Sequence, residues 1–184
     1  MAMDIFKEET VVKHHSGLNT AVYYLTWVMI VVFGFLGIMS LYSVLGQIGQ
    51  GFNWQSLLFS LVLIALAVLL FLKKDNLRVE YDYTLTNGVF DVHMALNNAK
   101  NKYLTQIELK TVESCGKVTS AAFQRYLNAK DVKKHNWFLN RDADLVYFYF
   151  VKNGVKHLVV IEPSPEMTEL IRTKSGLGYG VWQA

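Results

Sequence analysis

The alternation of polar and apolar residues divides the chain near Lys73 into two parts. Residues 16–72 contain no Asp, Glu, Lys, Arg or His, whereas most charged residues follow Leu72. Residues 21–45 and 54–72 are each apolar and long enough, at about 1.5 Å per residue, for a helix that crosses the roughly 30 Å hydrocarbon layer of a membrane. The pattern predicts a two-helix transmembrane hairpin over residues 21–72, with a tight polar turn at residues 46–53.

Small residues recur at helical spacing within both apolar segments. They are Gly34, Gly37 and Ser40 in the first segment and Ser60, Ala65 and Ala67 in the second. In a membrane, small residues allow two helix backbones to approach closely, so the segments are expected to pack against each other. Neither segment contains an ionisable residue, and nothing in them indicates an ion path or a substrate site at membrane depth.

Basic residues near the ends of these segments predict the orientation in the membrane. Lys7 and Lys13 precede the first segment and Lys73, Lys74 and Arg78 follow the second, while the connecting turn has no Lys or Arg. Because Lys and Arg are enriched on the cytoplasmic side, both termini are expected to be cytoplasmic. We therefore expect a cytoplasmic segment at residues 1–20, a cytoplasmic domain at residues 73–176 and a tail at residues 177–184. We expect the tail to be partly disordered, and the alternative is that its Tyr179 and Trp182 contact the domain or the membrane.

The cytoplasmic part begins with an alternation that is typical of antiparallel strands. In YDYTLTNGVFDVHMAL, residues 81–96, apolar and polar side chains alternate on both sides of Asn87-Gly88. Asn-Gly favours a two-residue type I′ turn, which places Leu85 opposite Phe90. The stretch predicts a hairpin with one apolar face and one face in water.

Further elements are less sharply marked. Strands are expected at residues 103–109 and 111–119, the second with a bulge at Gly116. The stretch at residues 120–141 is ambiguous, and we expect a short helix at residues 123–127 and a short strand at residues 137–139 within it.

A second hairpin and a final helix complete the predicted domain. Asn153-Gly154 marks another two-residue turn and places Phe150 opposite His157. Because these strands are apolar on both faces near their middles, we expect them to be central in a sheet, or to be covered on their second face by the final helix or the membrane anchor. The final helix is predicted to begin at Ser164 and Pro165 and to bury Met167, Leu170 and Ile171.

Three stretches carry a resemblance to known proteins: MDIFKEETVVKHH, YDYTLTNGVFDV and IEPSPEM. They resemble a two-span membrane protein family of clostridial-type bacteria, for which no activity is established. The resemblance implies a transmembrane helical hairpin followed by a mainly antiparallel β, pleckstrin-homology-like (PH-like) domain closed by one C-terminal helix. It also implies a location in the bacterial cytoplasmic membrane, and it supplies no catalytic residues.

The chain departs from the lipid-binding members of the PH-like group. Those domains hold phosphoinositide phosphates with basic residues on a roomy loop between the first two strands. Between the first two predicted strands of this chain lies the tight turn Thr86–Gly88, which has no cation. Phosphoinositide binding at the usual place is therefore not expected.

Composition argues against several other functions. The net charge of +3 is too small and too evenly spread for a nucleic-acid-binding face. Cys115 is the single cysteine, which excludes an internal disulfide, and we expect it to be a small buried strand residue. The His and hydroxyl residues lack the spacing of catalytic or metal-binding groups, so we expect no enzymatic activity, no metal and no cofactor.

Two non-enzymatic functions agree with these features. The first is a membrane-anchored scaffold that recruits a protein partner, or an accessory subunit of a larger membrane complex, which uses exposed sheet edges or residues 120–141. The second is recognition of anionic lipid headgroups, since each cation near an anionic leaflet contributes about 1 kcal/mol. The candidate contacts with lipid or partner are Arg125, Lys130, Lys133, Lys134, Trp137 and Arg141.

Overall fold

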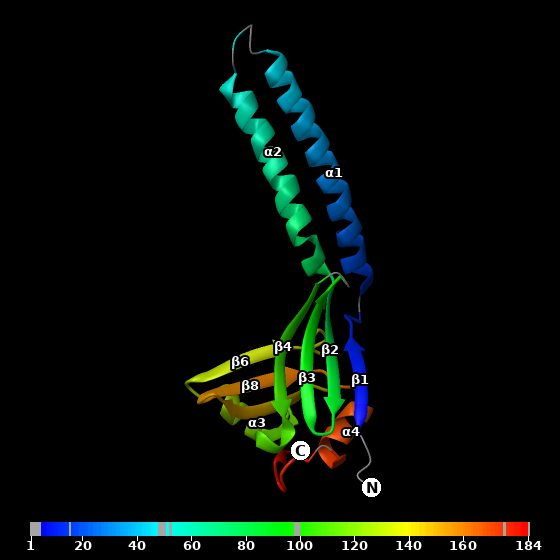
Figure 1. Cartoon of the computed structure of the whole chain (residues 1–184), viewed down its shortest axis with the longest axis vertical. Helices are drawn as coiled ribbons and strands as arrows, with labels where there is room; N and C mark the ends of the chain where they lie inside the picture. The colour runs from blue at the N-terminus through cyan, green and yellow to red at the C-terminus, as the bar shows by residue number, and fades with distance from the viewer. Residues whose placement is uncertain are drawn as a thin grey trace. The chain divides into compact units, whose positions relative to one another are not determined.

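A computed structural model describes residues 5–14, 16–47, 51, 53–97, 100–174 and 176–183. The chain divides into two compact units, a helical unit over His15–Val79 and a β unit formed by Met1–His14 together with Glu80–Ala184 (Figure 1). The β unit is thus discontinuous in sequence, because the helical unit is inserted within it.

The helical unit consists of the predicted hairpin and a short extension. It contains α1 (Ser16–Gly46), α2 (Trp54–Lys73) and a 3-10 helix, η1 (Lys74–Leu77). Two helices, at Gly17–Gly46 and Trp54–Leu77, are long and apolar enough to cross a membrane. The Asn53 side chain begins α2 by accepting hydrogen bonds from the backbone N–H groups of Gln55 and Ser56. Residues 48–50 and 52 of the expected turn lie outside the described residues.

Small residues bring α1 and α2 together, as predicted. The Ser60 hydroxyl is buried and lies 2.8 Å from the Ser40 hydroxyl. A Cβ atom on Gly37 would lie 2.7 Å from Cγ1 of Ile64, so only glycine allows this approach. The residues confirmed at this interface are Gly37, Ser40, Ser60 and Ala67, whereas Gly34 has open space beside it and Ala65 is exposed.

Cations and aromatic rings gather where the hairpin ends. The Lys74 ammonium lies 4.7 Å from the ring centroid of Phe71 and 5.3 Å from that of Trp27. The Arg78 guanidinium lies 4.0 Å from the ring centroid of Tyr23. Such contacts stabilise a cation beside the face of an aromatic ring, so they fasten η1 and the residue that follows it to α1.

The first sheet contains the predicted hairpin and one strand that we did not predict. It comprises β1 (Phe6–Val11), β2 (Val79–Thr86), β3 (Val89–Leu96) and β4 (Lys100–Glu108), in the order β1-β2-β3-β4. Asn87 and Gly88 between β2 and β3 have φ angles of 48° and 86°, which confirms the type I′ turn. Tyr83, Leu85 and Phe90 are fully buried, which confirms the apolar face.

The segment expected to be a cytoplasmic flank at residues 1–20 thus contributes β1, which pairs antiparallel with β2 from Phe6 opposite Thr86 to Val11 opposite Tyr81. The connection between the first two strands is therefore the whole helical hairpin. The turn Thr86–Gly88 connects the second and third strands, so our comparison with the lipid-binding loop was made at the wrong connection.

The second sheet contains β5 (Val112–Lys117), β6 (Val132–Trp137), β7 (Val146–Lys152), β8 (Val155–Ile161) and β9 (Trp182–Gln183), in the order β6-β8-β7-β5-β9. A 3-10 helix, η2 (Leu109–Thr111), precedes β5. The predicted register is confirmed, with Phe150 opposite His157. The bulge in β5 lies between Val112 and Ser114 and not at Gly116. The expected strand at residues 137–139 lies earlier, at β6.

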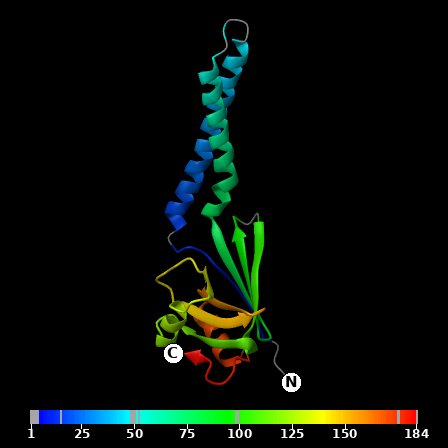
Figure 2. The same cartoon turned by 90° about the vertical axis from the view of Figure 1, so that its left-hand side faces the viewer.

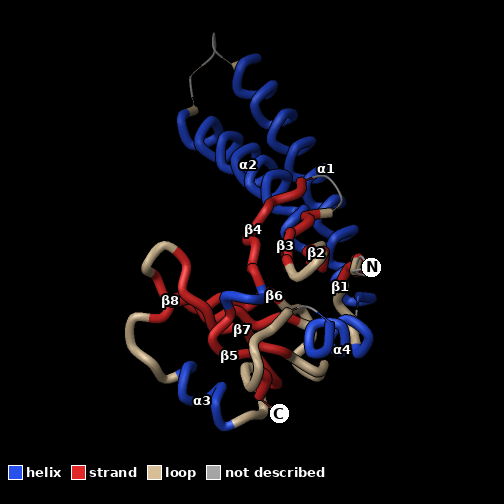
Figure 3. The backbone as a smooth tube through the Cα atoms, turned by 60° about the horizontal axis from the view of Figure 1, so that its bottom comes forward, coloured by secondary structure: helices blue, strands red, loops and turns tan. Residues whose placement is uncertain are grey.

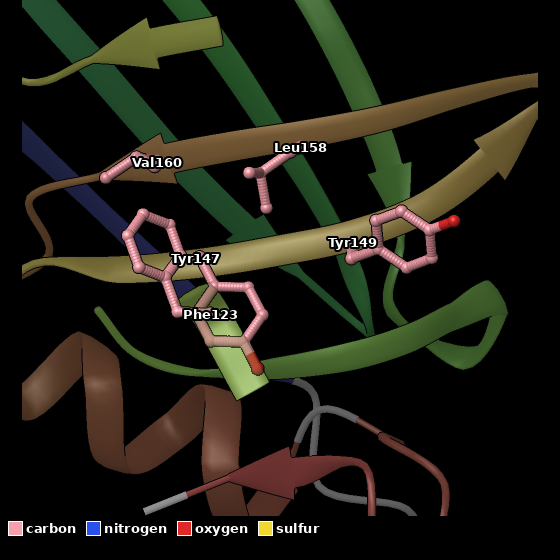
Figure 4. Packing of buried hydrophobic residues seen from close by; sticks show 5 residues of the cluster. All are labelled: Phe123, Tyr147, Tyr149, Leu158 and Val160. Carbon is pink, nitrogen blue, oxygen red and sulfur yellow. The ribbon is translucent and has the colours of Figure 1, made fainter. Parts of the chain in front are cut away.

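The second sheet is apolar on both faces, and each face is covered. On one face Phe148 lies 5.4 Å from Phe90 of the first sheet, measured between ring centroids, and the strands of the two sheets cross steeply (Figure 2). On the other face α3 (Ala121–Leu127) packs through Phe123. Its buried partners are Tyr147, Tyr149, Leu158 and Val160 (Figure 4). β7 and β8 are central in this sheet, which confirms one of our two alternatives. The cover of this face is α3, and not the final helix or the anchor of the other alternative.

The final helix, α4 (Pro165–Lys174), begins as predicted. The Ser164 hydroxyl accepts a hydrogen bond from the backbone N–H of Met167 at 3.1 Å, and Met167 and Ile171 are fully buried. The helix lies beside β1 (Figure 3), where Nζ of Lys7 is 2.5 Å from Oε2 of Glu166.

The tail is not disordered over its described residues, and the alternative that Trp182 contacts the domain is confirmed. Trp182 and Gln183 form β9, which pairs parallel with Cys115 and Gly116 of β5.

Candidate functional sites

The structure places the predicted lipid or partner contacts on several elements without gathering them into one face. Arg125 lies on α3, Lys130 follows it, Lys133, Lys134 and Trp137 lie on β6, and Arg141 lies in the next loop. The five cations are exposed and Trp137 is half-buried. Because side chains alternate along a strand, Lys133 shares a face with Trp137, and Lys134 points to the face on which Val132 packs against the α3 cluster.

Two histidines that the sequence did not single out meet on β6 and β8. Nε2 of His135 lies 3.2 Å from Nδ1 of His157, at hydrogen-bond distance. Aromatic rings lie on both sides of the pair: Trp137 is 4.9 Å from His135 and Phe150 is 5.4 Å from His157, measured between ring centroids. The two histidines lie on neighbouring parallel strands, so no short motif reveals the pair.

The surroundings of this pair favour neutral imidazoles. Burial lowers the pKa of His135, and the charge of Lys133 lowers it further. Burial also lowers the pKa of His157, and electrostatic interactions with His135, Lys133 and Lys152 lower it further. Lys133 and Lys152 thus place positive charge near two imidazoles whose neutral form is favoured.

The edge of β5 that faces away from β7 is paired with the chain's own tail, β9. The backbone N–H of Cys115 donates a hydrogen bond to the carbonyl of Val181 at 3.0 Å. A Cβ atom on Gly116 would lie only 1.9 Å from the carbonyl oxygen of Gln183, so glycine is required for this approach. The edge is therefore shaped to accept another backbone at close range.

A cavity of about 280 Å³ lies beside this docked tail. It is lined by Lys117, Asp144, Val146, Pro165, Thr168, Glu169, Arg172 and Trp182. The half-buried Trp182 ring is thus the tail's contribution to a pocket formed by the second sheet and α4.

A buried polar network joins β8 to the loop after β6 and to the segment after β1. Glu162, which is 6% exposed, accepts hydrogen bonds from the backbone N–H groups of Leu139 at 3.0 Å and Asn140 at 2.9 Å. The Asn140 side chain donates to the Val12 carbonyl at 3.0 Å and accepts from the backbone N–H of His14 at 2.8 Å. Because its polar atoms are paired with backbone groups, the network holds three chain segments together.

Catalytic groups were not predicted, and the described residues include no group of three or more His, Cys, Asp or Glu side chains that is arranged to hold a metal. Cys115 is fully buried, as expected. Burial raises the pKa of its thiol, which keeps it in the weakly nucleophilic protonated form.

The family model described as bacterial PH-like domain (DUF6106) matches residues 3–176. The match includes β1, the helical hairpin and α4. No match was found among curated proteins or among solved structures.

Proposed function

We propose that this chain, which belongs to the bacterial PH-like domain family, is a non-enzymatic, membrane-anchored module that recruits a partner protein. The partner's extended segment would add to the β5 edge and displace the chain's own tail. The observation that carries this proposal is the docking of β9 on β5.

The anchoring part of the proposal is supported by α1 and α2. Their length and composition suit membrane spans, and the distribution of Lys and Arg favours a cytoplasmic position for both termini. A β unit held at a membrane has a raised effective concentration for partners in that membrane, so a weak contact is sufficient for recruitment.

The recruiting part of the proposal is supported by the way that the edge accepts a strand. Strand addition derives its affinity from main-chain hydrogen bonds and its specificity from pockets for alternate side chains. The β5 edge offers both: the Cys115 N–H, now bonded to Val181, and a neighbouring cavity whose lining, apart from Trp182 of the tail, comes from residues that stay in place when the tail leaves, such as Val146 and Thr168.

The tail is held weakly enough to be displaced. β9 has only two residues, and a backbone hydrogen bond contributes on the order of 1 kcal/mol net. Gly176 and Gly180 flank the tail with positive φ angles of 79° and 75°, so its backbone follows a path that suits glycine and leaves no regular element to be unfolded on release.

The tail sequence itself is the first probe. A synthetic peptide, GLGYGVWQA, is added to the chain that ends at Ser175, and binding is followed by fluorescence anisotropy in detergent micelles. We expect the peptide to bind this truncated chain and to bind the full chain much more weakly, because the tail already occupies the edge. Equal binding to both chains would contradict the proposal.

Gly116→Ala in the truncated chain separates strand addition from non-specific binding. The added Cβ blocks any backbone at this position, so peptide binding should be lost. Gly154→Ala is the matched control, since Gly154 also has a positive φ angle, 74°, but its Cβ would meet no atom within 4 Å. Near-UV circular dichroism checks that each variant is folded.

Recruitment is tested in native membranes with a photo-crosslinking residue in place of Lys117, which is exposed and follows Gly116. We expect a crosslinked protein whose yield rises on tail truncation and falls on adding Gly116→Ala. If neither the tail truncation nor Gly116→Ala changes the crosslinking yield, recruitment through this edge is contradicted, even if the peptide result holds.

A further inference from the structure

We propose that Lys133, His135, Lys152 and His157 form a binding site for a phosphate group, and that the imidazole pair takes up one proton when the phosphate binds. This site lies on β6, β7 and β8 and is separate from the β5 edge.

The strand registers place all four side chains on one face. Lys133 is the direct neighbour of His157, and His157 is the direct neighbour of Phe150 on β7. Alternate residues of a strand share a face. His135 therefore lies on the same face as Lys133, and Lys152 lies on the same face as Phe150. This is the face that carries Phe148 toward the first sheet, and the four polar side chains lie on it nearer the β7-β8 turn.

The hydrogen bond between the histidines determines how many donors they offer. It uses Nε2 of His135 and Nδ1 of His157, and among the described residues neither ring makes a second hydrogen bond. A neutral pair therefore has one N–H donor and one acceptor on its remaining nitrogens. One added proton converts both remaining nitrogens to donors and gives the pair a positive charge.

The charges around the pair suit an oxyanion. Lys133 from β6 and Lys152 from β7 act on His157 electrostatically. Nζ of Lys152 donates one hydrogen bond, to the carbonyl of Gln106 at 3.0 Å, and an ammonium group has three donors. Glu108 lines the cavity next to Lys152, but its carboxylate lies 3.0 Å from Nζ of Lys110.

A phosphate group fits these donors better than a metal ion does. Its oxygens accept several charge-assisted hydrogen bonds at once. Phe150, whose ring stacks on that of His157, lines together with Lys152 a cavity of about 290 Å³. A metal ion would be repelled by both lysines. It would also find only two imidazole ligands among the described residues.

The test follows the histidine rings of the full chain by NMR in detergent micelles, with selective histidine labelling. The pH is varied from 8 to 5 with inorganic phosphate or with chloride at equal ionic strength. We expect phosphate to raise the apparent pKa of His135 and His157, whereas the ring signals of His93 should be the same in phosphate and in chloride. Because the pair takes up one proton, the affinity for a given ionisation state of phosphate should tighten by up to about tenfold per pH unit as the pH falls.

Three substitutions assign the effect. His157→Gln should remove the pH dependence of phosphate binding. Lys133→Gln, at an exposed position, should weaken phosphate binding but leave its pH dependence in place. His93→Gln is the control, because His93 lies on β3 and its ring contacts Tyr103. If His157→Gln does not fold, the Lys133→Gln result alone decides, since unchanged phosphate affinity in that variant overturns the site.

A second arm identifies the source of the phosphate group. Nanodiscs of phosphatidylcholine with or without phosphatidic acid are compared in phosphate-free buffer. A shift of the His135 and His157 signals with phosphatidic acid assigns a lipid headgroup, and a shift with inorganic phosphate alone assigns a soluble phosphate. Identical titrations in phosphate and chloride, together with no response to phosphatidic acid, would overturn the proposal.

Discussion

Replacing Tyr83 by Phe should destabilise the β unit, because the phenol connects the two sheets. Tyr83 is on β2 and is fully buried. Its hydroxyl donates a hydrogen bond to the Trp137 carbonyl and accepts one from the backbone N–H of Glu162 at 3.3 Å. The substitution keeps the ring and removes only these two hydrogen bonds.

The expected loss follows from the two groups left behind. A buried backbone group without a partner costs roughly 1–3 kcal/mol, and the Glu162 N–H and the Trp137 carbonyl both lose one. The variant no longer has to desolvate a hydroxyl, which offsets part of the loss. We expect the free energy of unfolding to fall by about 2–4 kcal/mol, which corresponds to a fall in Tm on the order of 10 °C for a unit of this size.

Near-UV circular dichroism of the full chain in detergent measures this change, since buried aromatic residues of the β unit dominate the signal. Tyr103→Phe is the matched control, because Tyr103 is 53% exposed and its loss should change stability by less than about 0.5 kcal/mol. If Tyr83→Phe and Tyr103→Phe melt within 1–2 °C of each other, the hydroxyl does not connect the sheets energetically and the reasoning fails.

Three further outcomes are expected. Burial raises the pKa of Tyr83 and Cys115, so both are neutral when folded. The free energy of unfolding should fall by up to about 1.4 kcal/mol per pH unit for each group, as the pH rises above about 9 for Cys115 and about 10 for Tyr83; Cys115→Ala should flatten an alkaline melting series. Glu162→Gln removes a carboxylate that accepts from two backbone N–H groups and should cost roughly 2 kcal/mol in chemical denaturation. Gly37→Leu places a large side chain against Ile64 and should reduce crosslinking between cysteines introduced into α1 and α2.

Local features of the sequence are sufficient for the hairpins and the apolar helices. The turns at Asn87-Gly88 and Asn153-Gly154 require positive φ angles that Asn and Gly adopt readily, so the two-residue connection determines the register of the adjoining strands. The hairpin helices are marked by composition alone. Each of these elements depends on residues close together in the sequence.

The remaining features depend on contacts between distant residues. α3 is short, and its role as the cover of the second sheet depends on Phe123 meeting Tyr147. The pair of His135 and His157 arises because β6 lies parallel to β8 at the sheet edge. Neither arrangement produces a spacing pattern that can be recognised in the sequence. The candidate cations were grouped because they are close in sequence, but alternation along β6 places Lys133 and Lys134 on opposite faces.

β1 was missed for a different reason. The side chains of Lys7 and Glu9 lie on its more buried face, where an alternating strand normally carries apolar residues. Lys7 is paired with Glu166, and Glu9 accepts a hydrogen bond from the backbone N–H of Ser164 at 2.9 Å. Contacts with α4 and the residue before it therefore take the place of apolar burial in holding β1. A strand without apolar alternation is easily interpreted as a loop from its sequence.

The position of β1 changes how the β unit must be studied. An antiparallel helix pair returns the chain to the side from which it started, so strands that flank the pair can meet although Phe6 and Thr86 are far apart in sequence. A fragment that starts after residue 73 lacks β1 and exposes the edge of β2, where unpaired backbone groups promote association with other strands. It also lacks the partners of Glu166 and of the Ser164 N–H. We therefore expect such a fragment to aggregate in gel filtration, and addition of a peptide spanning residues 1–14 to restore a monodisperse species; a fragment that is monodisperse by itself would show that β1 is dispensable to the sheet.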